Sequence, residues 1–323
     1  MLRNFCIGAT MIALCSASAV AQPADPDIVV VGERLEQVTR EYVTTLAAPS
    51  MREDQLARWD ERVCVGVAGL SPSDGQMVAD RISVRAAAVG LRTGEPGCRA
   101  NIMVIFAPDS DAVAQNIVRE RRELLGYYTN DAVSTSGGRE GLEAFANTPR
   151  PIRWWHVARN VTADGRVLDT TQTAPAASGA ESRSANEAAA SGQPSTGVGS
   201  FTGLQTTRSN GSRVRRNTRQ DLDYVLIIVD ARRVAEFPVA AWVDYVAMVS
   251  LAQINPDAAP SSVPSILNLF TSPVESTPMG MTDWDVAYLD GLYAATREAT
   301  NAAAQQREIG RRIVAAMTAE RPN

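Results

Sequence analysis

The single histidine of the chain limits the chemistry that the chain could perform. His156 is the only histidine among 323 residues, so a metal site built on two imidazole ligands is excluded, as is the H-E-x-x-H helical motif. Any catalytic pair in which a histidine activates a serine or a cysteine would have to use His156, and no G-x-S-x-G motif supplies the serine. His156 adjoins Trp154 and Trp155. We expect a packed or surface histidine there rather than a catalyst, with one tryptophan ring in the core and the other under a loop.

Lysine chemistry is excluded as well, because the chain contains no lysine and its basic side chains are arginines. A catalytic Schiff base on lysine is therefore impossible, and a P-loop motif, which needs a lysine, is absent. Carboxylates remain as the groups that could run acid–base chemistry without histidine. No spacing singles out a pair, and acids near helix starts usually serve as caps. The available aspartates are Asp221, Asp223, Asp230, Asp244, Asp283 and Asp285.

The first 21 residues have the pattern of a cleavable secretory signal. Arg3 supplies a positive charge, an apolar stretch runs from Phe5 to Leu14, and Ala19-Val20-Ala21 matches an A-x-A cleavage site. The apolar stretch is too short to span a bilayer, which takes about 20 residues. We therefore expect cleavage between Ala21 and Gln22, a periplasmic or secreted location, and no transmembrane segment in the mature chain.

Two cysteines remain in the mature chain, Cys64 and Cys98, because Cys6 and Cys15 lie within the signal. An even number of cysteines in an oxidising compartment predicts a disulfide. Closing a loop of this length stabilises a fold by about 3–4 kcal/mol on the chain-entropy account. The alternative is a nucleophilic Cys64, which the oxidising surroundings and the ready partner disfavour.

The charge balance disfavours a nucleic-acid partner. Residues 22–323 carry 30 arginines against 36 acids, a net charge of −6, because the signal removes one of 31 arginines and no acid. Phosphate backbones are bound through an excess of basic residues. The arginine cluster at 213–219 is expected to be a solvated segment ahead of a strand. We expect a protein or glycan partner in the cell envelope, and no cofactor.

Residues 174–212 differ in composition from the rest of the chain. They are small or polar, with Phe201 and Leu204 almost the only bulky apolar side chains. Such a segment buries too little apolar surface to offset the entropy of ordering, so we expect it to be disordered. We interpret it as an insertion in one domain, because the part after it has a single strong strand. The expected organisation is a signal peptide at 1–21, the first part of the domain at 22–173, the insertion at 174–212, and the second part at 213–323.

Strand and helix patterns alternate along the chain. Tyr224–Val229 is the most apolar run and is expected to be a central strand. Residues 152–161 alternate in polarity, which predicts a half-exposed strand. The other expected strands lie at 28–31, 63–67 and 102–106, and the expected helices lie at 33–46, 71–89, 109–125 and 239–254, from Thr282 to about 293, and at the C-terminus up to about Met317. We expect an α/β (α+β) fold: a mixed sheet flanked by helices, interrupted by the insertion, with a helical C-terminus.

Three sequence motifs follow one another after the insertion, and their order resembles that of a known protein family. The helix W-V-D-Y-V-A-M-V-S-L at 242–251 is followed by S-I-L-N-L-F at 265–270 and T-D-W-D-V-A-Y-L-D-G-L-Y at 282–293. This order resembles the second half of zincin-type metallopeptidases, in which an H-E-x-x-H-x-x-G-L helix, an S-I-M/F-N stretch and an L-T-x-x-D-x-x-x-L-x-x-L-Y helix succeed one another. The whole chain also resembles uncharacterised secreted bacterial proteins with this layout. The zincin-like stretch covers about a fifth of the chain.

The resemblance lacks the chemistry of the family. In register, Val243 and Ala247 stand where the two zinc-binding histidines would be, and Asp244 stands in place of the catalytic glutamate. Ser250-Leu251 replaces Gly-Leu. Losing two imidazole ligands leaves no zinc site of that class. The resemblance therefore implies a zincin-like fold without its active site, a pseudoenzyme.

Three functions remain as hypotheses. The first is an exported, non-catalytic binding or scaffold protein on a zincin-like frame, which a packed apolar interior around Val243, Ala247 and Met248 would favour. The alternative is a metal-independent periplasmic hydrolase that uses carboxylates, which a cleft with two acids, one of raised pKa, would favour. The third is an assembly protein that uses residues 174–212 as a tether.

Overall fold

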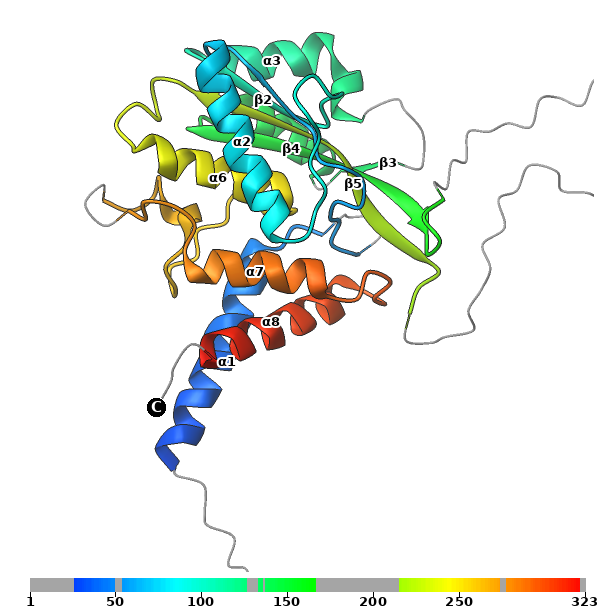
Figure 1. Ribbon diagram of the computed structural model, residues 1–323, viewed down its shortest axis with the longest axis vertical. Helices are drawn as coiled ribbons and strands as arrows, with labels where there is room; N and C mark the ends of the chain where they lie inside the picture. The colour runs from blue at the N-terminus through cyan, green and yellow to red at the C-terminus, as the bar shows by residue number, and fades with distance from the viewer. Residues whose placement is uncertain are drawn as a thin grey trace, which may run out of the picture.

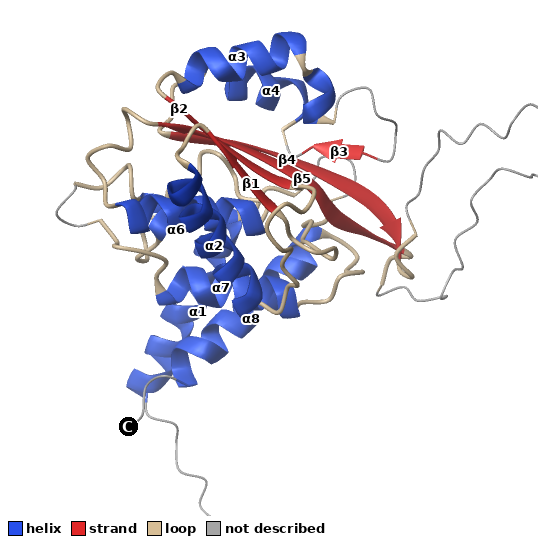
Figure 2. Ribbon diagram, turned by 45° about the horizontal axis from the view of Figure 1, so that its top comes forward, coloured by secondary structure: helices blue, strands red, loops and turns tan. Residues whose placement is uncertain are grey.

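The computed structural model describes residues 26–49, 54–126, 133–135, 137–166, 215–273 and 277–319. The expected signal peptide at 1–21 and the expected insertion at 174–212 lie outside these ranges. Within them the chain forms a mixed α/β fold, in which helices cover both faces of a five-stranded sheet (Figure 1, Figure 2). Among these residues no helix has both the length and the hydropathy that crossing a membrane requires.

The sheet combines parallel and antiparallel pairs. β1, β2 and β5 run parallel to one another, while β4 lies antiparallel to both β5 and β3. The predicted strand at 224–229 is confirmed as part of the central strand β5. The order across the sheet is β1 (Val65–Ala68), β2 (Ile102–Ala107), β5 (Thr218–Asp230), β4 (Ile152–Thr162) and β3 (Val133–Thr135).

Each face of the sheet has its own core. Successive side chains of a strand point to opposite faces, so Val225 and Ile227 enter the larger core while Leu226 and Ile228 enter the smaller one. The larger core is covered by α2 (Pro72–Ala88) and α6 (Val239–Leu251), with α1 (Pro26–Leu46), the short turn η2 (Ile266–Asn268), α7 (Asp283–Ala294) and α8 (Ala302–Ala319) beyond them (Figure 2). The smaller core lies under α3 (Ser110–Glu120), η1 (Arg122–Leu125) and α4 (Gly138–Asn147).

Local capping signals fix the starts of two helices as predicted. Ser71 Oγ accepts a hydrogen bond from the Asp74 N–H at 3.2 Å ahead of α2, and Pro72 occupies the first turn, where it has no N–H to leave unpaired. Thr282 and Asp285 form a capping box at the start of α7. The helical spacing of residues 71–89 predicts Met77 on the buried face, but its side chain is 43% exposed.

The strand predicted at 28–31 is wrong, because these residues belong to α1, which runs unbroken from Pro26 to Leu46. A four-residue apolar run does not distinguish a strand from a helix by itself. Gly32 follows the apolar run and could end a strand there, but it lies inside the helix, where a glycine costs about 1 kcal/mol without ending it.

The strand predicted at 152–161 is confirmed as β4, but its predicted half-exposure is wrong. β4 is buried on both faces, and its two tryptophans both lie in cores rather than one in a core and one under a loop. Trp154 packs on Tyr245 of α6 and Trp155 on Phe145 of α4, each with ring centroids 5.9 Å apart. The alternation of polar and apolar residues at 152–161 therefore belongs to a strand whose two faces are both buried, and neither face is exposed to solvent.

Candidate functional site

His156 is a core residue. It is 3% exposed on β4, and its Nε2 lies 2.8 Å from the carbonyl oxygen of Val249. Burial lowers its pKa from 6.5 to about 4 by disfavouring the charged ring, against hydrogen bonds to the backbone of Val249 and Ala252 that act in the opposite direction. The ring is therefore neutral near pH 7 and serves the junction between β4 and α6.

The tryptophans beside His156 do not form one stacking face for a sugar. Trp154 and Trp155 are 4% and 5% exposed and point to opposite sides of the sheet. Both contribute to the lining of a cavity of about 370 Å³ between α4 and the loop at 254–257. Their indole N–H groups are already used, because they donate to the carbonyls of Ile254 and Leu125 at 3.1 and 3.0 Å.

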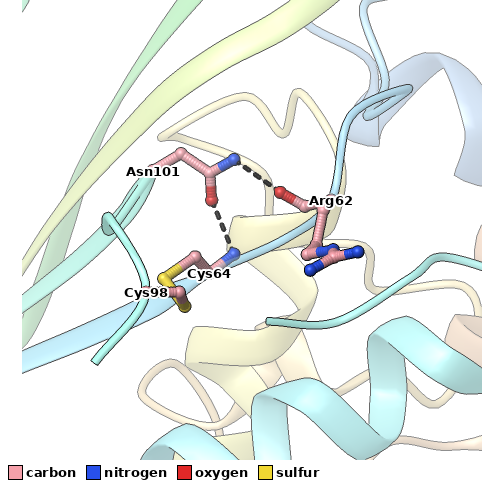
Figure 3. The surroundings of a disulfide bond; sticks show 4 residues. All are labelled: Arg62, Cys64, Cys98 and Asn101. Atoms are coloured by element: carbon pink, nitrogen blue, oxygen red, sulfur yellow. Dashed lines mark hydrogen bonds between the residues drawn. A yellow bond between two sulfur atoms is a disulfide. The ribbon is translucent and has the colours of Figure 1, made fainter. Parts of the chain in front are cut away.

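Cys64 and Cys98 form the predicted disulfide, which joins the entry of β1 to the turn before β2 (Figure 3). Their Cα atoms are 6.1 Å apart. Asn101 supports the bridge from the side, since its Oδ1 accepts from the Cys64 N–H at 2.8 Å and its Nδ2 donates to the Arg62 carbonyl at 2.9 Å. A side chain at Gly94 would collide with the Cys98 sulfur. Both thiols are thus consumed in a structural bond.

Asp244, which the sequence resemblance aligns with the catalytic glutamate of zincins, is a fully buried ion-pair centre. Its two oxygens accept five hydrogen bonds: two from Arg81 at 2.8 Å, two from Arg85 at 3.1 and 2.5 Å, and one from the Met281 N–H at 2.9 Å. Burial alone would raise the pKa of Asp244, but the two guanidinium groups outweigh it and lower the pKa to about 2. The carboxylate is locked in its ionised form and fastens α6 to α2.

Val243 and Ala247, which the same resemblance aligns with two zinc-binding histidines, lie in the larger core. Val243 and Ala247 are 0% exposed, as is Met248 beside them. The interior around these three residues is apolar and packed, which is the arrangement that the non-catalytic hypothesis requires. Within the described ranges, no group of three His, Cys, Asp or Glu side chains is placed to hold a metal ion.

Asp285 brings together the segments at 265–270 and 282–293. It is 0% exposed and accepts hydrogen bonds from Ser265 Oγ at 2.6 Å and from the Ile266 N–H at 2.7 Å, both ahead of α7. The Tyr42 hydroxyl of α1 donates to it at 3.0 Å, and the Thr282 N–H donates at 2.9 Å. Asp285 is therefore a packing residue that joins α1, η2 and α7.

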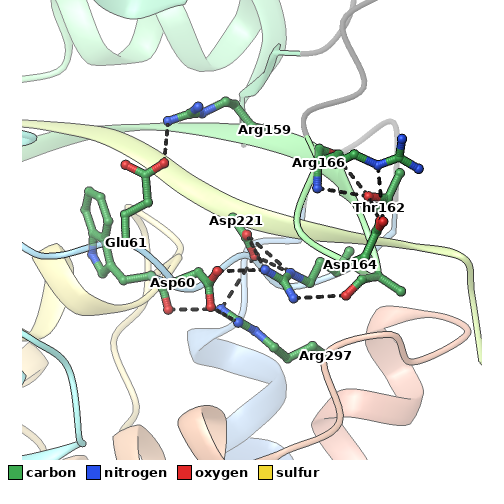
Figure 4. A network of polar contacts seen from close by, with 11 residues as sticks. Asp60, Glu61, Arg159, Thr162, Asp164, Arg166, Asp221 and Arg297 are labelled. Carbon is green, nitrogen blue, oxygen red and sulfur yellow. Dashed lines mark hydrogen bonds and ion pairs between the residues drawn. The ribbon is translucent and has the colours of Figure 1, made fainter. Parts of the chain in front are cut away.

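A pair of carboxylates with opposite pKa shifts lies near the far end of β5 (Figure 4). Burial raises the pKa of Asp221, and its ion pairs with Arg219 and Arg297 do not offset this. At Asp60 burial acts in the same direction, but hydrogen bonds from Arg297 and Arg219 lower the pKa. Arg219 Nη2 lies 2.7 Å from Asp60 and 3.0 Å from Asp221. The two acids therefore face shared guanidinium groups, as in a structural ion-pair network.

A second ion-pair network occupies the carboxyl ends of the parallel strands, where open α/β sheets commonly bind ligands. Arg153, 1% exposed, donates to Asp111, which also accepts from Arg233 at 2.7 Å. Hydrogen bonds from Arg233 lower the pKa of Asp111. Asp230 accepts from Ser110 Oγ at 3.0 Å. These contacts tie α3 to the sheet, while the buried Arg153 Nε has no hydrogen-bond partner among the described residues. No local pattern in the sequence indicates the partner of Arg153.

α1 and α8 cross (Figure 1), and beside their crossing lies an open hollow of about 760 Å³, which we call the α1–α8 groove. Arg40 of α1 and Arg307 and Arg311 of α8 line it. Val43 and Val314 contribute apolar surface between them. Among the described residues no carboxylate pairs with any of these three arginines. The groove thus combines an apolar floor with uncompensated positive charge, and sequence reasoning missed it.

Comparison with protein-family models, with curated proteins and with solved structures finds no match for this chain. Its function is therefore argued from its own geometry.

Proposed function

We propose that this chain is an exported, non-catalytic binding or scaffold protein, built on a frame that resembles a zincin-type metallopeptidase without its metal site. The observation that carries the proposal is the state of Asp244. A general base needs a free lone pair and a pKa near the working pH. Asp244 instead accepts five hydrogen bonds with a pKa of about 2.

Two further observations support a fold that has kept the packing of the family and not its chemistry. Val243 and Ala247 fill the histidine positions with buried apolar side chains. Asp285 joins Ser265 to the start of α7, so the surviving motif residues are those that hold segments together. Fold likeness does not carry function, and the proposal rests on these contacts.

Export is supported by the pattern of residues 1–21 and by the disulfide between Cys64 and Cys98, a bond that persists in oxidising compartments. Cell fractionation of the producing bacterium, followed by N-terminal sequencing of the purified protein, tests this part. We expect a periplasmic or secreted protein that begins at Gln22. An uncleaved chain in the cytoplasm with two free thiols would contradict it.

The non-catalytic part is tested on the purified mature protein. We expect no stoichiometric zinc by elemental analysis and no turnover of denatured protein or peptidoglycan substrates. One bound equivalent of zinc, or turnover that the chelator phenanthroline abolishes, would overturn the proposal.

The alternative function is a metal-independent hydrolase, and the opposite pKa shifts of Asp60 and Asp221 favour it. In this case Asp221→Asn would abolish a measurable turnover while the fold stays intact. Asp223→Asn is the matched control, since Asp223 lies two residues along β5 and pairs with Arg159. Turnover lost in the first variant alone would replace the non-catalytic proposal.

A further inference from the structure

We propose that the α1–α8 groove binds an acidic amphipathic helix of a partner protein. The inference rests on the proposed binding function and names its surface and the kind of partner. It is carried by three features of the groove: its unpaired positive charge, its length along both helices, and its narrow, small-residue floor.

The arginines that line the groove outnumber its acidic residues. Arg40, Arg307 and Arg311 line it without an ion-pair partner there, and Glu36 is the one acid in its wall. Some arginines elsewhere in the fold are compensated, as Arg81 is by Asp244 and Arg297 is by Asp60. Three arginines against one glutamate give the groove a net charge of +2, so a ligand that carries carboxylates complements it.

The groove runs along both helices. Its lining on α8 recurs at one-turn spacing from Ala303 through Arg307 and Arg311 to Ala315, which is one face of the helix. From Ala303 to Ala315 there are twelve steps of 1.5 Å, so this face extends over roughly 18 Å. An elongated occupant of three to four helical turns fits this length better than a compact small molecule.

The floor admits a third helix. Gly310 faces Thr39 of α1, and a Cβ added at Gly310 would lie 3.7 Å from the threonine methyl group. α1 and α8 therefore approach closely there, and the concave surface above them is made of small or apolar side chains such as Val43 and Val314. An amphipathic helix laid into such a groove buries its apolar face between the two walls.

The three arginines of the groove would bind the acidic side chains of that helix. Arg307 and Arg311 are one turn apart on one wall, and Arg40 stands on the other. Glutamates three or four residues apart on the incoming helix meet the first two in turn, through charge-assisted hydrogen bonds. A flat anionic membrane would reach the rim of the groove and leave its floor empty, so the observations favour a helix over a lipid surface.

The probe is a synthetic 18-residue amphipathic helix with a leucine and alanine stripe flanked by glutamates four residues apart. A second peptide carries glutamine at every glutamate position. Binding to the mature protein is measured by fluorescence anisotropy with labelled peptide. We expect saturable binding of the acidic peptide, with the glutamine peptide at least about tenfold weaker, the loss of one to two charge-assisted contacts. No binding of the acidic peptide at 100 μM protein, or equal binding of both peptides, would overturn the proposal.

Two pairs of variants locate the site. Arg307→Glu with Arg311→Glu is expected to weaken binding at least about tenfold, whereas Arg34→Glu with Arg312→Glu, which changes the net charge equally outside the groove, leaves it unchanged. Ala315→Trp fills the groove without altering charge and abolishes binding, whereas Ala316→Trp on the adjacent position does not. Circular dichroism and thermal unfolding verify that all four proteins fold.

Vesicles of phosphatidylglycerol test the rival hypothesis that the groove binds an anionic membrane surface. Binding of the vesicles that Arg307→Glu with Arg311→Glu removes, without binding of the acidic peptide, would assign the groove to a membrane surface and overturn the helix proposal. Failure here is distinct from failure of the proposed function. A chain that binds no peptide and shows no turnover refutes the groove alone, while turnover that depends on Asp221 refutes the non-catalytic function alone.

Discussion

Replacing Asp244 by asparagine tests whether this carboxylate holds α6 to α2, as its contacts imply. Its pKa falls from an ordinary 3.8 to about 2 in the folded chain. A shift of nearly two pKa units corresponds to roughly 2–3 kcal/mol of stability at neutral pH. Removing one partner of a buried pair costs about 3–5 kcal/mol, but Arg81 and Arg85 are 40% and 27% exposed and can turn to water. We therefore expect Asp244→Asn to lower the free energy of unfolding by about 2–4 kcal/mol at pH 7.

The loss of unfolding free energy in Asp244→Asn should depend on pH, and this dependence provides the most specific test. Because the folded pKa of Asp244 lies below the unfolded value, its stabilisation is complete above pH 3.8 and disappears as the pH falls towards 2. Urea unfolding of the wild type and of Asp244→Asn at pH 7, 5, 3 and 2 measures the difference directly. The gap between the two proteins should be constant from pH 7 to 5 and should narrow below pH 4.

Asp80→Asn is the matched control, because Asp80 is an exposed aspartate of α2 whose recorded side-chain contact is the Gln76 amide. We expect a change within about 0.5 kcal/mol at every pH, as for most surface substitutions. A loss of under 0.5 kcal/mol for Asp244→Asn at pH 7, or a gap that does not narrow in acid, would refute the reasoning.

Three further predictions concern other parts of the chain. Replacing both Cys64 and Cys98 by alanine should lower the free energy of unfolding by about 3 kcal/mol, and a reductant should lower the melting temperature of the wild type but not of this variant. Burial holds the pKa of His156 at about 4 in the folded chain against 6.5 when unfolded, so stability present above pH 6.5 should fall by roughly 3 kcal/mol as the pH drops to 4. In His156→Gln this pH dependence between 6.5 and 4 should be absent; if it persists, other groups cause it. Deleting 176–210, within the segment whose composition predicts disorder, should leave the melting temperature within about 2 °C, and a larger drop would show that the segment belongs to the core.

The parts of the fold that the sequence predicted are those determined by local interactions. Ser71 and Thr282 cap their helices through backbone groups three residues away, so the signal and its effect share one short window. The run at 224–229 is apolar on both of its faces, which requires a strand covered on both sides. These elements kept their predicted type and place.

The parts that the sequence could not predict depend on contacts between distant residues. Arg81 and Asp244 are 163 residues apart, and neither has a neighbour that indicates the pairing. The strand expected at 28–31 became helix because its continuation packs on α8, which lies at the other end of the chain. The α1–α8 groove arises from the same long-range crossing, so no window of the sequence contains its signal.

The hydrogen bond from Tyr42 to Asp285 also bears on when the chain can fold. It joins residues 243 positions apart, and the ring of Tyr42 packs on Trp284 and Tyr288 of the same late helix. Topologies with such distant contacts fold slowly, because a long loop must close before the contact stabilises it. α1 therefore cannot pack on α7 until nearly the whole polypeptide has become available for folding. A chain exported as an extended polymer from its N-terminus, as its first residues predict, would complete this fold only after translocation has ended.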